Sequence, residues 1–121
     1  MTIENSVLIS AALIKNTAEQ KLEAEATIAD KARLCFELSF TESCGWLLSN
    51  DDKRFRAGCA ALLLLSDEES QEKINKELLV IQSLGAAMSG IQIKMDDALA
   101  NLNPIGLLGL YNNEKAKFNR E

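Results

Sequence analysis

The sequence predicts an all-α protein, and three features support this. Of its 121 residues, 47% are hydrophobic but only 5% are aromatic, so aliphatic residues that favour helices must build most of the core. One proline and six glycines leave few points at which a helix has to end. Apolar residues also recur at steps of three and four positions, as along one face of a helix. We expect an elongated helical hairpin or a small bundle with two long helices (about 3–43 and 67–102) and a shorter buried helix (about 52–65).

The first long helix is expected because no glycine or proline occurs between Thr2 and Ser43. Charged residues fall on the face opposite the apolar one, and small alanine side chains in its middle would let a partner helix approach closely. A break near Asn16 and Thr17 is the alternative to one continuous helix. The apolar face consists of Val7, Ala11, Ile14, Ala18, Leu22, Ala26, Ala29, Phe36 and Phe40.

The shorter helix follows a polar turn at 49–52, where Asn50 or Asp51 is suited to cap its first backbone amides. Four consecutive leucines at 62–65 leave its end without a polar face, which indicates a central, buried helix; a short buried strand is the alternative. The basic group at 53–56 lies beside two aspartates. We therefore interpret it as a solvated charge cluster rather than as an anion site.

The second long helix has a start and an end signal. Ser66 and Glu69 have the spacing of a capping box, and Asn103-Pro104 ends the helix because proline disfavours a helical residue before it. Between them, apolar residues repeat every seven positions, which is typical of left-handed packing between helices. Gly85 and Gly90 would permit close packing or a bend at its centre. The predicted interaction seam comprises Ile74, Leu78, Ile81, Gly85, Met88, Met95, Leu99 and Leu102.

Residues 104–121 are expected to form an apolar clip and a polar tail of the same single domain, residues 1–121. The tail clip comprises Leu107, Leu108, Leu110 and Tyr111. These residues are too few to form a core of their own, so they must dock on another surface. Docking on the parent helices and docking on a second subunit or target both remain open.

The net charge and the hydropathy of the chain exclude several classes of binding partner. The formal net charge is -5, and an acidic protein repels the phosphates of nucleic acid and of anionic membrane surfaces. No apolar run reaches the roughly 20 residues needed to span a bilayer. The apolar stretch at 7–14 follows an acidic residue, so we interpret it as part of a helix rather than as a signal peptide. We expect a cytoplasmic protein, with export without a cleavable signal peptide as the alternative.

Catalytic and cofactor chemistry finds little support in the sequence. The chain has no histidine, hence no Ser–His or Cys–His pair, and it has no phosphate-binding glycine motif. Its three cysteines, Cys35, Cys44 and Cys59, lack metal-ligand spacing and are expected to be reduced core residues. We expect no enzymatic activity, no cofactor and no metal.

The apolar faces exceed what three helices can bury, which favours self-association. The sequence therefore predicts a structural or assembly protein that forms a homo-oligomer through its long amphipathic helices. One alternative is an acidic binding module, such as a chaperone, inhibitor or immunity-type protein, that holds one helical protein partner. A weaker alternative is a regulator that binds a small ligand between its helices, near Cys59, Gln92 and Asn101.

Overall fold

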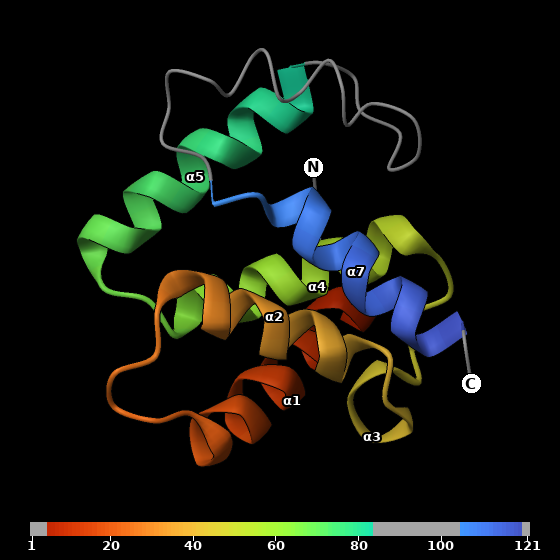
Figure 1. The fold of residues 1–121 in the computed structure, drawn as a ribbon. Helices are drawn as coiled ribbons and strands as arrows, with labels where there is room; N and C mark the ends of the chain where they lie inside the picture. Colours follow the sequence, from red (N-terminus) through yellow and green to blue (C-terminus); the bar gives the residue numbers. More distant parts are fainter. Residues whose placement is uncertain (1–4, 84–104, 120–121) are drawn as a thin grey trace.

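The computed structural model describes residues 5–83 and 105–119, and in this part of the chain it contains helices and no strand. Figure 1 shows these helices packed against one another, so the predicted all-α small bundle is confirmed. The helices are α1 (Asn5–Lys21), α2 (Ile28–Ser39), α3 (Glu42–Gly45), α4 (Asp51–Leu64), α5 (Glu68–Ser83) and α7 (Leu107–Asn119).

The prediction of one helix over 3–43 is wrong, because this stretch forms α1, α2 and α3. Helix α1 runs through Asn16 without a break and ends at Lys21. The chain then turns, and Thr27 starts α2 by accepting a hydrogen bond from the amide of Asp30 at 3.1 Å. The Asp30 carboxylate accepts one from the amide of Thr27 in return, which completes a capping box. Because of this turn, α2 folds back and packs beside α1 and α4 (Figure 1).

Helix α4 confirms the predicted short helix and lies against both α1 and α2. Asn50 is its N-cap and accepts a hydrogen bond from the amide of Lys53 at 2.9 Å, as its position predicts. The leucine run at its end is only partly buried, since Leu62 is fully buried whereas Leu64 is 60% exposed. The expectation that this run has no solvent-facing side is therefore wrong for Leu64.

An aromatic cluster joins α2, α4 and α7. The rings of Phe36 and Phe55 stack at 5.6 Å, and Tyr111 meets both edge-on at 5.5 and 5.8 Å. Phe40 extends the cluster from α2 towards Phe118 at the far end of α7. Every phenylalanine and the single tyrosine of the chain thus gather in one place, although aromatic residues are scarce. Such contacts add about 0.5–1.5 kcal/mol per pair to the burial of the rings.

Helix α5 begins one residue later than its predicted capping box. The hydroxyl of Ser66 donates to the carbonyl of Leu62 at 2.6 Å and so belongs to the end of α4. Asp67 caps α5 instead, accepting a hydrogen bond from the amide of Ser70 at 2.8 Å. The cap of Ser66 with Glu69 is therefore a wrong prediction, because the Ser66 side chain is used by the preceding helix. The predicted second helix lies outside the described residues from position 84 to 102.

A buried carboxylate on α5 holds the start of α7. Glu77 is 2% exposed, and it accepts hydrogen bonds from three successive amides, those of residues 105, 106 and 107, at 2.5, 3.1 and 2.7 Å. Gly106 has a φ of 81°, a conformation that glycine adopts readily and that turns neighbouring amides towards one anion. The negative charge also lies at the positive end of the α7 dipole. We call this contact the Glu77 cap.

Candidate functional site

The described part of the interaction seam points into the protein. Ile74 is fully buried, Ile81 is 7% exposed, and Leu78 is partly buried and packs against the same core. These three positions therefore lie in or against the core of the chain itself. The other five seam residues, Gly85, Met88, Met95, Leu99 and Leu102, lie outside the described residues.

The tail clip is the first part of a helix that packs on the protein itself. Leu107 and Tyr111 are fully buried, Leu108 is 3% exposed, and Leu110 packs against the core at partial exposure. Their helix, α7, lies along α2 (Figure 1). Of the two docking surfaces left open by the sequence, the structure places these residues on the parent helices. The helical conformation of 112–119 had no counterpart in the sequence-based prediction of a polar tail.

Helix α1 carries an exposed apolar face, which we call the α1 face: Leu8, Ile9, Ala12 and Leu13. Leu8, Ile9 and Leu13 are 49, 48 and 36% exposed, and Ala12 between them is also exposed. The opposite face of the helix is buried in the core. No charged residue occurs in α1 before Lys15, whose ammonium pairs with Glu19 one turn further on. Exposed apolar side chains that lie together in this way mark a candidate interaction surface.

The second surface is a groove between α2 and α7, which we call the α2–α7 groove. It consists of two adjoining hollows of about 280 and 380 Å³ that share Glu37, Glu114 and Lys117. Asp30, Arg33 and Leu34 line the smaller hollow, and Phe40, Thr41 and Phe118 line the larger one. Charged groups thus line one end of the groove, and aromatic rings line the other.

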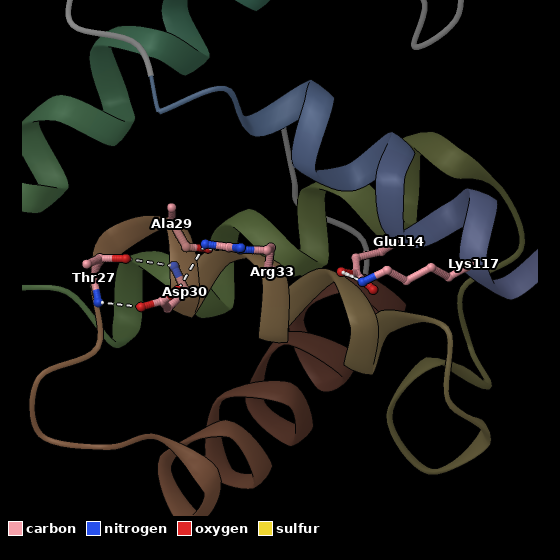
Figure 2. A network of polar contacts seen from close by, with 6 residues as sticks. All are labelled: Thr27, Ala29, Asp30, Arg33, Glu114 and Lys117. Carbon is pink, nitrogen blue, oxygen red and sulfur yellow. Dashed lines mark hydrogen bonds and ion pairs between the residues drawn. The ribbon is translucent and has the colours of Figure 1, made fainter.

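The acidic residues of the groove differ in their surroundings. Figure 2 shows two groups of polar contacts, one on α2 and one on α7. On α2, Asp30 pairs with Arg33 at 2.9 Å, and the hydrogen bonds from Thr27 lower the pKa of its carboxyl. On α7, Glu114 is 7% exposed and pairs with Lys117 at 3.2 Å. Glu37 is exposed and forms no ion pair within residues 5–83 and 105–119.

The guanidinium of Arg54 lies close to the aromatic end of the groove. Phe118 is 49% exposed, and its ring stacks on that of Phe40 at 5.2 Å. The guanidinium carbon of Arg54 lies 5.1 Å from the centre of the Phe40 ring, which is within the range of a cation–π contact. Arg54 belongs to the basic group 53–56, which was expected to be solvated. It also donates to the carbonyl of Ser39 at 3.4 Å, so this member of the group has a defined partner.

The three cysteines lie in the core as expected, each at most 3% exposed. Burial raises the pKa of the Cys35 thiol to about 12, and burial first, with the nearby charge of Glu77 second, raises that of Cys59. A thiol must lose its proton to act as a nucleophile or as a metal ligand. The thiols of Cys35 and Cys59 are therefore held in the protonated form, which neither attacks a substrate nor binds a metal. Cys59 lies in the core and lines neither hollow of the groove.

Neither the α1 face nor the α2–α7 groove was predicted from the sequence, for different reasons. The α1 face was missed because the buried face of the same helix, which includes Val7 and Ile14, gave the stronger periodic pattern. The run of uncharged residues at 5–14 was its visible signal. The groove had no signal, because Glu37 and Glu114 are far apart in the sequence and meet only when α7 lies along α2.

The described residues contain neither a metal-binding cluster nor a membrane-spanning helix. No group of three or more cysteine, aspartate or glutamate side chains in this part of the chain is placed to hold a metal ion. Within residues 5–83 and 105–119, no helix combines the length and the apolar character needed to cross a bilayer. In comparisons with known proteins, the chain matches no family model, no curated protein and no solved structure.

Proposed function

We propose that this protein is a non-catalytic assembly protein that associates with copies of itself, and that the α1 face is the surface through which it does so. The observation that supports this is the exposure of Leu8, Ile9 and Leu13 side by side on one helix. Single exposed leucines are common on soluble proteins, but contiguous apolar patches mark interaction sites.

A second copy of the chain fits this face better than a random partner. Because the protein carries a net charge of -5, two copies repel each other over most of their surface. The α1 face has no charge between Asn5 and Ile14, so two copies can approach there with the least repulsion. Ala12 lies in the middle of the face, and its small side chain lets two helix backbones come close. An antiparallel pair of α1 helices would bring Leu8 of one copy against Leu13 of the other, as a twofold axis requires.

The described part of the interaction seam does not form the proposed interface between copies. Ile74 and Ile81 are buried within one protomer, so the seam does not supply the contact over 74–81. An interface made of α1 alone would be small, below the roughly 1,200 Å² of a stable specific complex. We therefore expect a dimer that dissociates on dilution in the micromolar range rather than a permanent one.

Light scattering after size-exclusion chromatography, over a dilution series, tests the proposal. The wild-type protein should move from dimer to monomer on dilution, and Leu8→Glu should give a monomer at every concentration. Leu64→Glu is the matched control, because Leu64 is 60% exposed and lies on α4. Both variants should keep the wild-type circular dichroism spectrum. A wild-type protein that is monomeric at about 100 µM, which is a hundredfold above a dissociation constant of about 1 µM, would overturn the proposal.

A further inference from the structure

We infer that the α2–α7 groove is a binding site for an arginine side chain from a basic segment of a partner protein. This goes beyond self-association, because the groove and the α1 face lie on different helices. The charge of the groove, the burial of Glu114 and the aromatic surface support the inference.

The charge of the groove favours one added cation. Its lining carries three carboxylates, from Asp30, Glu37 and Glu114, and two cations, from Arg33 and Lys117. Two of the carboxylates are paired with those cations. Glu37 is the carboxylate without an ion pair among the described residues, so one positive charge from outside would neutralise the lining. The net charge of -5 would also attract a basic segment over a longer range.

Glu114 is held in a way that suits such a ligand. Its side chain is nine-tenths buried, which costs free energy for a carboxylate unless a cation lies beside it. Lys117 provides that cation, but its own side chain is 69% exposed and is therefore free to move into solvent. A guanidinium that enters the groove can replace the ammonium at Glu114 while it also reaches Glu37.

The aromatic end distinguishes arginine from lysine. The exposed ring of Phe118 stacks on Phe40 and lines the larger hollow, whose volume is about 380 Å³. A guanidinium is planar, is weakly hydrated and donates several hydrogen bonds in its plane, so it can stack on a ring and bind carboxylates at once. An ammonium lacks the flat face. The guanidinium of Arg54 lies over the ring of Phe40, which shows that this ring accepts one, and the exposed ring of Phe118 offers a second aromatic face.

A peptide titration followed by NMR tests the inference. The probe is an acetylated and amidated pentapeptide, Gly-Gly-Arg-Gly-Gly, added to the isotope-labelled full chain; the comparison peptide has lysine in place of arginine. We expect amide shifts at Glu37, Thr41, Lys117 and Phe118, and binding by the lysine peptide at least about twofold weaker. This ratio corresponds to the lower range for a cation–π contact at an exposed site.

Three variants locate the site. Glu37→Gln and Phe118→Leu should each weaken arginine binding about two- to fivefold, as exposed ion pairs and cation–π contacts do. Glu72→Gln removes the same charge from α5, where Glu72 pairs with Lys76, and should leave binding unchanged. Amide shifts that avoid the groove, equal binding of the lysine peptide, or equal losses in Glu37→Gln and Glu72→Gln would each overturn the inference. The Leu8→Glu variant should bind the peptide as the wild type does, so this test is independent of self-association.

Discussion

Replacing Glu77 tests whether one buried carboxylate holds the C-terminal helix in place. The perturbation is Glu77→Ala, which removes both acceptor oxygens of the Glu77 cap and leaves the amides of residues 105–107 without them. The amide of Leu107 is buried, and the other two are part-buried. After the substitution, water can therefore reach the amides of residues 105 and 106 more easily than it can reach the amide of Leu107.

The size of the effect follows from these surroundings. A buried donor left without a partner costs about 1–3 kcal/mol, and we assign about 2 kcal/mol to the amide of Leu107. Loss of a helix cap costs about 1 kcal/mol, which covers the two part-buried amides together. The charge at the α7 dipole adds about 0.5 kcal/mol. Glu77→Ala should therefore lower the free energy of unfolding by about 3–4 kcal/mol. Glu77→Gln keeps one carbonyl acceptor and should cost about half as much.

Urea denaturation monitored by circular dichroism measures this difference. With a slope of about 1–3 kcal/mol per molar urea, Glu77→Ala should lower the midpoint by about 1–4 M. Glu72→Ala is the control, because this glutamate of the same helix is exposed, pairs only with Lys76 among the described residues, and should change stability by less than about 0.5 kcal/mol. If Glu77→Ala and Glu72→Ala are equally stable, the carboxylate does not hold α7 and the reasoning fails.

Three further predictions concern the core. Gly58→Ala should destabilise the protein by about 1–3 kcal/mol in urea denaturation, although alanine favours helix, because the added carbon would lie 2.5 Å from the ring of Phe36; equal or greater stability would contradict this. Burial and then the hydrogen bond to Asp51 raise the pKa of Tyr111, the single tyrosine, above its usual 10.0. The protonated tyrosine therefore stabilises the fold below pH 10, and this stabilisation is lost as the pH rises further. Absorbance at 295 nm should show no tyrosinate in the folded protein at pH 10.5, and Tyr111→Phe should be less sensitive to alkali. Half-ionisation of the tyrosine near pH 10 would refute this prediction. Cys35 and the other two thiols should resist a disulfide reagent at pH 8 until urea unfolds the chain, and rapid labelling of the native protein would contradict their burial.

Local chemistry explains which parts of the fold could be predicted from the sequence. Helix α4 has a strong N-cap residue at Asn50 and a periodic core face, and both act within a few residues of each other. The break between α1 and α2 was missed because residues 23–26 alternate glutamate and alanine, which are both good helix formers. The spacing of Thr27 and Asp30 was its one local signal. The tertiary contacts of α2 with α4 and α7 outweigh the helix propensity of this stretch, because propensity is a weak influence that tertiary packing routinely overrides.

The caps and the groove show a second limit. Ser66 and Asp67 are both good N-cap residues, and a bond from Ser66 back to Leu62 decides between them. Glu77 could not be distinguished from the exposed glutamates around it, because its partners are the backbone amides of 105–107, which carry no sequence signature. The α2–α7 groove likewise depends on two helices that are distant in the chain. A sequence pattern reports a face of one helix, whereas these features exist only after several helices have met.

The aromatic cluster also bears on how the protein is made. Phe36 and Phe55 pack against each other early in the chain, but Tyr111, which covers both rings, follows Phe55 by 56 residues. At about 5–20 residues per second, a ribosome needs about 3–11 s to synthesise that stretch. During this time the two rings lack their cover, and nascent apolar surface of this kind is prone to aggregate. Folding during translation should therefore remain incomplete until α7 emerges, and a chaperone that binds aromatic segments would find its target between α2 and α4.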